Sequence, residues 1–217
     1  MDKYVLIVAG GKGLRMGGDL PKQFIPMRGK PLLMHTLEAF HRWDASARII
    51  LVLPEDHQPY WNMLCKEIGC KVPHAIVKGG DTRFFSVKNG LYWLLAERRR
   101  KGEEDSGLSL VAVHDGVRPF VSPEVVEACF DKAAVTGAVI PVVPMIDSLR
   151  ETDEKGSHPV DRSRYMAVQT PQVFLLELLT KAYEQPYSSL FTDDASVVEA
   201  MGHAIDTVPM RNGFSPS

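Results

Sequence analysis

The sequence has few cysteines, no long hydrophobic run and no surplus of charge of either sign. Its 217 residues include three cysteines, Cys65, Cys70 and Cys129, whose spacing matches neither a disulfide framework nor a zinc site. Its apolar runs are far shorter than the ~20 residues that cross a bilayer, and its start does not resemble a signal peptide. We therefore expect a cytoplasmic protein with reduced thiols and no membrane partner.

The charge balance excludes a general nucleic-acid binder. Lys and Arg together number 25 and Asp and Glu 27, which gives a formal charge of −2, whereas such binders need a basic surplus. One basic run, residues 98–101, falls at the end of a helical pattern, where cations complement the helix dipole and face solvent. Apolar residues make up 45% of the chain and charged residues 24%, which is typical of a soluble globular protein. We expect one domain over residues 1–217.

Short apolar runs alternate with helical patterns along the chain. The runs at 4–9, 49–53 and 108–113 are rich in Val, Ile and Leu, which suits strands covered on both faces. Apolar residues recur at helical spacing within 33–40, 87–94 and 123–133. This alternation indicates βαβ units with right-handed crossovers. It predicts a doubly wound, mostly parallel α/β sheet.

Residues 145–162 break the alternation, because they are rich in charged side chains and poor in apolar ones. The segments on either side, 137–144 and 165–174, have the apolar character of strands. A polar stretch of roughly 20 residues inside a compact domain is either disordered or contacts something else. We predict a projecting two-stranded arm.

A glycine-rich loop follows the first predicted strand, with the sequence Ala9-Gly10-Gly11-Lys12-Gly13-Leu14-Arg15. Glycines let the backbone turn sharply and present N–H groups to an anion. The loop is neither a P-loop nor the dinucleotide fingerprint, since Met16 stands where the latter needs a small residue. Lys12, Arg15 and the nearby Lys22 favour a triphosphate ligand over a purely structural turn.

A second motif, residues 79–86, lies between a predicted strand and a predicted helix. Asp81 or Thr82 can cap that helix, which is its structural interpretation. The segment also faces the carboxyl edge of the sheet, where ligands of open α/β folds bind. The Gly79-Gly80 backbone and the short hydroxyl of Ser86 could then recognise a base.

A third motif, His114-Asp115-Gly116-Val117-Arg118-Pro119, follows the apolar run at 108–113. A carboxylate at a strand end, such as Asp115, suits a hard cation like Mg²⁺ that bridges phosphates. An ion pair between Asp115 and Arg118 that orders the turn is a compatible alternative.

The motifs resemble those of one family when they are taken in order. They are Ala-Gly-Gly-x-Gly-x-Arg-Met-Gly, Pro-Lys-Gln, Gly-Gly-Asp-x-Arg, Ser-Val, His-Asp-x-x-Arg-Pro, Val-Asp-Arg, Gln-Thr-Pro-Gln-x-Phe and Thr-Asp-Asp-Ala-Ser. Together they resemble the 2-C-methyl-D-erythritol 4-phosphate cytidylyltransferases of the non-mevalonate isoprenoid pathway, over most of the chain. Ribitol-5-phosphate cytidylyltransferases share the set and are the nearest alternative.

The resemblance implies a Rossmann-like nucleotidyltransferase fold and an Mg²⁺-dependent transfer from CTP to a polyol phosphate, with release of pyrophosphate. It implies catalytic roles for Arg15 and Lys22 and a metal-binding role for Asp115. It implies nucleotide binding by Ala9, Gly10, Gly11, Gly13, Gly80, Asp81, Ser86 and Gly116. It implies substrate binding by Arg118, Asp147, Ser148, Arg162 and Thr170. It also implies a homodimer in which the arm, residues 145–162, reaches the partner's active site.

The last residues depart from the family pattern. The family has an Asn-Ile-Lys stretch, whose lysine helps to position the substrate phosphate, followed by a final helix. Here residues 208–217 read Val-Pro-Met-Arg-Asn-Gly-Phe-Ser-Pro-Ser, and no lysine follows Lys181. A second interpretation is therefore a catalytically weakened paralogue that only binds nucleotide or pairs with another subunit.

Overall fold

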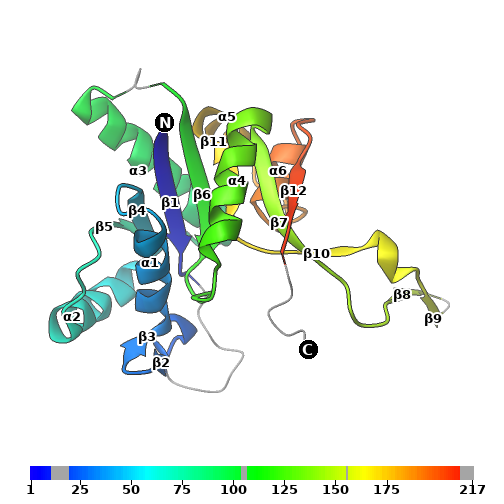
Figure 1. The fold of residues 1–217 in the computed structure, drawn as a ribbon, viewed down its shortest axis with the longest axis horizontal. Coiled ribbons are helices and arrows are strands. Elements are labelled where there is room, and N and C mark those ends of the chain that lie inside the picture. Colours follow the sequence, from blue (N-terminus) through cyan, green and yellow to red (C-terminus); the bar gives the residue numbers. More distant parts are fainter. Residues whose placement is uncertain (11–19, 104–106, 155, 211–217) are drawn as a thin grey trace.

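The computed structural model describes residues 1–10, 20–103, 107–154 and 156–210. Within them, the central element is an eight-stranded sheet in the order β10-β7-β11-β6-β1-β4-β5, with β12 also paired to β7 (Figure 1). Its strands are β1 (Asp2–Val8), β4 (Arg48–Leu53), β5 (His74–Lys78), β6 (Ser109–Asp115), β7 (Ala138–Pro144), β10 (Met166–Val168), β11 (Gln172–Leu175) and β12 (Asp206–Pro209).

The strand directions confirm the predicted doubly wound, mostly parallel sheet. β1 pairs in parallel with both β4 and β6, and β4 pairs in parallel with β5. β11 is antiparallel to β6 and β7, and β10 is antiparallel to β7. The parallel half therefore places the ends of β1, β4, β5 and β6 along a single edge.

Helices cover both faces of the sheet. They are α1 (Leu32–Trp43), α2 (Gln58–Ile68), α3 (Arg83–Lys101), α4 (Pro123–Thr136), α5 (Leu176–Ala182) and α6 (Asp194–Glu199). Successive side chains of β1 point to opposite faces: Val5 and Ile7 join the cluster that includes α1, α2 and α4. Tyr4 and Leu6 join the cluster that includes α3, α5 and α6. β1 is thus buried on both sides, as its continuous apolar run predicts.

Shorter elements surround the sheet. They are the strands β2 (Pro26–Met27) and β3 (Lys30–Pro31) and the single turns η2 (Lys22–Phe24), η3 (Glu55–His57) and η4 (Arg162–Arg164). Within the described ranges, no helix has the length and apolarity needed to cross a membrane.

The polar segment forms a hairpin that projects from the body of the molecule (Figure 1). Its strands, β8 (Arg150–Asp153) and β9 (Gly156–Pro159), pair only with each other in a separate antiparallel sheet. The segments that flank the predicted arm are strands of the main sheet: 137–144 contains β7, and 165–174 is divided between β10 and β11. The β8–β9 hairpin thus lies within residues 145–162, where the sequence predicts an arm.

One expectation for the basic run is wrong. Arg98 does not face solvent: it is 5% exposed and donates hydrogen bonds to the Tyr4 hydroxyl at 2.6 Å and to Ser109 Oγ at 2.8 Å. Arg100 and Lys101 pair with Glu97 on the surface, as expected. The position of Arg98 next to the start of the sheet, where polar groups need a partner, explains the difference.

Candidate active site

The predicted ligand-binding loops meet at the carboxyl edge of the parallel strands. Backbone hydrogen bonds connect these strand ends, from Ala9 N–H to Val52 O (3.0 Å), from Gly116 N–H to Val8 O (2.9 Å) and from Gly79 N–H to Leu53 O (3.0 Å). A Cβ built on Gly116 would lie 2.8 Å from Ala9 Cβ, so only glycine allows these two strand ends to come this close. The structure thus brings Ala9, Gly80 and Asp115 to one edge.

The turn that carries Lys22 is held against the end of β1. Its neighbour Gln23 is buried and donates a hydrogen bond from Nε2 to the Ala9 carbonyl at 3.1 Å. Phe24 is buried as well and makes edge-on ring contacts with His57 and Tyr60. These two anchors place the half-exposed Lys22 next to Ala9, where the glycine-rich loop begins. Gly11, Gly13 and Arg15 of that loop lie outside the described residues.

The Gly79-Gly80 segment is held by Ser86. Gly80 N–H donates to Ser86 Oγ at 3.0 Å, and Ser86 Oγ donates to the Thr82 carbonyl at 2.9 Å. A Cβ on Gly80 would lie 2.5 Å from Phe85 Cβ, so the backbone turn requires glycine there. Thr82, and not Asp81, caps α3. The Ser86 hydroxyl is thus engaged within the loop, and it shapes the backbone that the base is expected to meet.

The same hydroxyl lies close to the first loop. A Cβ built on Gly10 would be 3.6 Å from Ser86 Oγ. Gly10, at the start of the predicted triphosphate loop, is therefore close to the segment predicted to bind the base.

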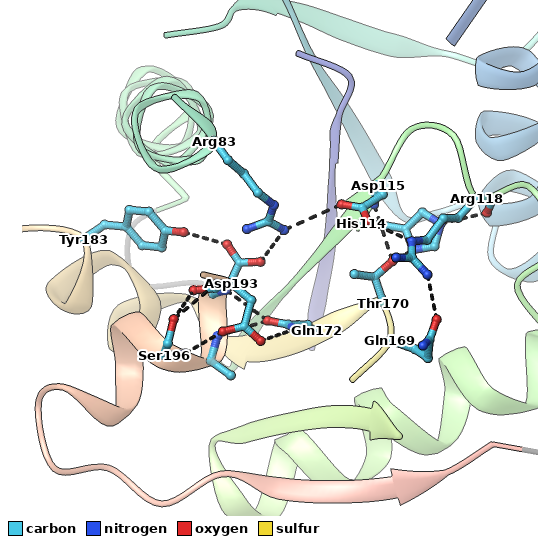
Figure 2. A network of polar contacts seen from close by, with 12 residues as sticks. Arg83, His114, Asp115, Arg118, Gln169, Thr170, Gln172, Tyr183, Asp193 and Ser196 are labelled. Carbon is cyan, nitrogen blue, oxygen red and sulfur yellow. Dashed lines mark hydrogen bonds and ion pairs between the residues drawn. The ribbon is translucent and has the colours of Figure 1, made fainter. Parts of the chain in front are cut away.

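Asp115 is held between two arginines (Figure 2). Arg118 Nε donates to Asp115 Oδ2 at 2.8 Å, and Arg83 Nη2 lies 3.8 Å from Asp115 Oδ1. Arg118 also donates from Nη1 to Gln169 Oε1 at 2.6 Å. The ion pair between Asp115 and Arg118 that the sequence allowed as an alternative is present. It leaves the Asp115 side chain partly exposed at the end of β6.

Thr170 is attached to the same strand end through His114. Thr170 Oγ1 lies 2.9 Å from His114 Nδ1, and His114 Nε2 lies 3.0 Å from the Arg118 carbonyl. Burial lowers the pKa of His114 to about 4, so the ring is neutral at pH 7. A neutral ring must donate Nε2–H to the carbonyl, so that Nδ1 accepts from the Thr170 hydroxyl.

A buried ion pair next to Asp115 was not predicted from the sequence. Arg83 Nη2 donates to Asp194 Oδ2 at 2.7 Å, and the Tyr183 hydroxyl donates to Asp194 Oδ1 at 2.6 Å (Figure 2). The Asp194 side chain is fully buried. Burial acts to lower the pKa of Arg83, but the pKa is raised overall, chiefly by the nearby Asp194 carboxylate. Burial and the same carboxylate raise the pKa of Tyr183. Arg83 thus remains charged between Asp194 and Asp115.

Gln172 completes this network from β11. Its Oε1 accepts hydrogen bonds from the backbone N–H groups of Asp194 (3.1 Å) and Ala195 (3.0 Å), and its Nε2 donates to Asp193 Oδ2 at 2.9 Å. Asp193 caps α6 in a capping box with Ser196. Only one of the adjacent residues Asp193 and Asp194 can cap the helix. The second aspartate is therefore the signal in the sequence that Asp194 has another role.

The predicted substrate contacts of the arm are not brought to this edge. Asp147 and Ser148 are exposed, and Arg162 donates a hydrogen bond to the Ile146 carbonyl at the base of the arm. Arg162 is therefore next to the segment that carries Asp147 and Ser148. No contact in the described part of the chain connects these three residues with Asp115 or Lys22.

Asp115 is the residue that the sequence predicts as a magnesium ligand. In the described ranges, no cluster of three or more His, Cys, Asp or Glu side chains is present. Mg²⁺ commonly uses one or two carboxylates together with substrate phosphates and does not need such a cluster. A partly exposed carboxylate at the end of β6, on the same sheet edge as Ala9, fits this type of site.

Comparisons with known proteins agree with this geometry. Residues 4–213 match the model of the family IspD, 2-C-methyl-D-erythritol 4-phosphate cytidylyltransferase. A protein of that name from Bacteroides fragilis is 55% identical over 202 residues, which are 93% of this chain and 87% of that protein. The structure is similar to that of the 2-C-methyl-D-erythritol 4-phosphate cytidylyltransferase from Thermus thermophilus, with a TM-score of 0.69, 31% identity and coverage of 97% and 90% of the two chains. A 4-diphosphocytidyl-2C-methyl-D-erythritol synthase from Anaerococcus prevotii gives a TM-score of 0.75 at 26% identity, over 96% of this chain and 86% of that one.

Proposed function

Because the chain belongs to the family of 2-C-methyl-D-erythritol 4-phosphate cytidylyltransferases, we propose that it transfers the cytidylyl group of CTP to 2-C-methyl-D-erythritol 4-phosphate. The products are 4-diphosphocytidyl-2-C-methyl-D-erythritol and pyrophosphate. The match of residues 4–213 to the family is the observation that carries this proposal. The meeting of the predicted loops at one sheet edge supports it, since open α/β sheets bind ligands there.

The proposed chemistry is an attack by a phosphate oxygen of the alcohol substrate on the α-phosphorus of CTP. Negative charge on the oxygens around that phosphorus must be stabilised as the bond to pyrophosphate breaks. The anchored turn next to Ala9 supports this role for Lys22. The backbone of Ala9 and Gly10 and the Gly79-Gly80 turn would hold the nucleotide, with Ser86 fixing the shape of that turn.

Mg²⁺ would be held by Asp115 and by the phosphates of the nucleotide. When bound, it neutralises phosphate charge and so favours approach of a second anion. Arg118 and Arg83 keep the Asp115 carboxylate at the strand end in the absence of other ligands. We place this chemistry in the cytoplasm, because the three cysteines are free and structural disulfides are rare there.

The alcohol phosphate would be bound with help from a second copy of the chain. Large apolar side chains are exposed at the base of the arm, among them Ile146 (61%) and Met166 (55%). Their exposure supports a protein partner at this surface. The arm would carry Asp147, Ser148 and Arg162 to the partner's site, and Arg162 is suited to bidentate binding of a phosphate.

The substrate assignment is tested by measuring pyrophosphate release with CTP and each of two acceptors. We expect turnover with 2-C-methyl-D-erythritol 4-phosphate and little with ribitol 5-phosphate. Turnover with ribitol 5-phosphate alone would overturn the assignment of the acceptor. Binding of CTP without pyrophosphate release from either acceptor would support the weakened paralogue.

The swapped arm is tested by mixing two inactive variants, Lys22→Met and Arg162→Ala, under conditions that allow subunits to exchange. In a swapped dimer, one of the two sites of each heterodimer combines an intact Lys22 with an intact Arg162 from the partner, so activity returns in part. Heterodimers that demonstrably form and remain inactive would show that Arg162 does not act across the interface.

A further inference from the structure

Cys65 and Cys70 are brought together where helix α2 ends. Gly69 caps the helix with a φ of 75°, and the N–H groups of Gly69 and Cys70 both donate to the Cys65 carbonyl, at 3.0 and 2.9 Å. The Cys70 bond is the 6→1 bond of a Schellman motif, in which the residue after the glycine folds back onto the last turn of the helix, and the Gly69 bond is the 5→1 bond of an αL motif. The side chains of residues 65 and 70 occupy the two positions that contact each other in the Schellman motif.

The two thiols interact and are accessible. The neighbouring Cys65 thiol lowers the pKa of Cys70 to about 6, against the opposing effect of burial. The Val72 N–H and the more distant Lys30 also favour the Cys70 thiolate, whereas Glu38 disfavours it. The neighbouring Cys70 and burial both raise the pKa of Cys65. Both side chains are partly exposed.

Cys129 provides a contrast within the same chain. It lies fully inside the core between α4 and the sheet, and burial raises its pKa to about 12. A buried neutral thiol reacts slowly with oxidants, because the thiolate is the nucleophile. The chain thus contains one accessible pair of thiols, Cys65 and Cys70, and one buried thiol, Cys129.

We propose that Cys65 and Cys70 form a reversible oxidation site, at which a hydroperoxide converts the two thiols into an intrachain disulfide. The Cys70 thiolate attacks the peroxide oxygen, the O–O bond breaks, and hydroxide leaves as Cys70 becomes a sulfenic acid. Cys65 sulfur then attacks Cys70 sulfur, and the hydroxyl group leaves with the Cys65 proton as water. Overall, two thiols and one hydrogen peroxide give one disulfide and two waters.

Disulfide formation between Cys65 and Cys70 would protect Cys70 from irreversible oxidation. A sulfenic acid without a neighbouring thiol can be oxidised further to sulfinic acid, whereas a resolving cysteine stops the reaction at the disulfide. The site lies on α2, at the opposite end of the molecule from the β8–β9 hairpin (Figure 1). A dimer contact through the arm would therefore leave it accessible.

Mass spectrometry of the native chain tests the proposal directly. The reduced protein is treated with a small excess of hydrogen peroxide, its remaining thiols are alkylated, and it is digested with trypsin without reductant. Lys66 lies between the two cysteines, so the disulfide would join the separate peptides 49–66 and 67–71. We expect this pair with the loss of two hydrogens, its disappearance after dithiothreitol, and unmodified Cys129. Sulfinic acid on Cys70, or equal modification of Cys129, would overturn the proposal.

Two variants separate the roles of the thiols. Cys65→Ser keeps a hydrogen-bond donor but removes the resolving thiol, so Cys70 should remain reactive and accumulate as a sulfenic acid trapped by dimedone. Cys65→Ala removes the donor as well, and alkylation of Cys70 near neutral pH should slow by about tenfold as its thiolate fraction falls. Equal alkylation rates in the two variants would show that Cys65 does not activate Cys70.

Discussion

The carboxyl edge of the main sheet and the β8–β9 hairpin both carry residues predicted to contact one substrate, but they are held in opposite ways. At the edge, buried polar side chains hold the loops: Gln23 and Ser86 are each 2% exposed. Every residue of the two hairpin strands is exposed. Its side-chain contacts, such as that of Arg150 with Ser157, are open to solvent.

The difference indicates which part of the site one chain can organise by itself. Buried hydrogen bonds and ion pairs fix side chains because breaking them leaves unpaired groups away from water. Exposed contacts compete with water and contribute little. One chain therefore fixes the side chains at the edge by itself, whereas it does not fix those of the hairpin in the same way.

Removal of the buried carboxylate should produce the largest change in stability. Asp194→Ala leaves Arg83 and the Tyr183 hydroxyl without their partner. Loss of one member of a buried ion pair typically costs about 3–5 kcal/mol, and we expect the free energy of unfolding in urea to fall by that amount. The control is Glu151→Ala on the hairpin, where the carboxylate is exposed and a change below about 0.5 kcal/mol is expected. Equal effects would refute the contrast between the regions.

Substitution of Lys22 tests whether the anchored edge serves catalysis. If Lys22 stabilises charge only as the reaction proceeds, Lys22→Met should lower kcat about 100-fold or more, with CTP affinity and unfolding unchanged. Pyrophosphate release and calorimetric CTP binding measure the two quantities. Lys71→Met is the matched control, since Lys71 is exposed beyond the end of α2. If Lys22→Met keeps activity near that of the unmodified enzyme, Lys22 has no catalytic role.

Much of the fold could be predicted because its signals are local. β1, β4 and β6 are buried on both faces, so their sequences are continuous apolar runs, and α1, α3 and α4 carry apolar stripes. α2 was not predicted, since Trp61 is its only buried residue and its pattern is correspondingly weak. The short helices α5 and α6 give too few turns for a periodic signal.

The site was harder to predict where its contacts join distant positions. Gly80 and Asp115 follow strands, and the parallel sheet brings such ends together. The partner of Arg83 lies 111 positions away at Asp194, and no spacing in the sequence connects the two. Arg98 shows the same limit, because a basic run gives no sign that one of its members is buried against Tyr4.

His74 in the main sheet and His158 in the hairpin allow the two regions to be compared as the pH changes. His74 in β5 accepts a hydrogen bond from Trp61 Nε1 at 3.0 Å and donates from Nδ1 to the Val72 carbonyl, and burial lowers its pKa. The native state thus binds fewer protons than the unfolded state below the ordinary histidine pKa of about 6.5. Stability should therefore fall as the pH drops below that value and towards the lowered pKa of His74.

Urea unfolding at several pH values measures this loss. His74→Gln keeps an acceptor for Trp61 but does not titrate, so its stability should fall less steeply on acidification than that of the unmodified chain. His158→Gln is the control on the hairpin, where the contact with Glu151 is exposed. An unchanged slope in His74→Gln would show that the buried ring does not contribute to the pH dependence.

The smallest changes in stability are expected when a serine is replaced by alanine at the sheet edge and in the hairpin. Ser86→Ala removes the buried acceptor of a part-buried hydrogen bond from the Gly80 N–H, which should lower the free energy of unfolding by about 0.5–1.5 kcal/mol. Ser157→Ala removes an acceptor of Arg150 on the hairpin, where water replaces it and the change should stay below about 0.5 kcal/mol. Unfolding is measured on isolated subunits at low concentration, because a partner that covers the hairpin would bury the same contact. A cost at Ser157 that appears only as the dimer forms would then locate the hairpin in the interface, whereas a large cost in the separated subunit would show that one chain already fixes it.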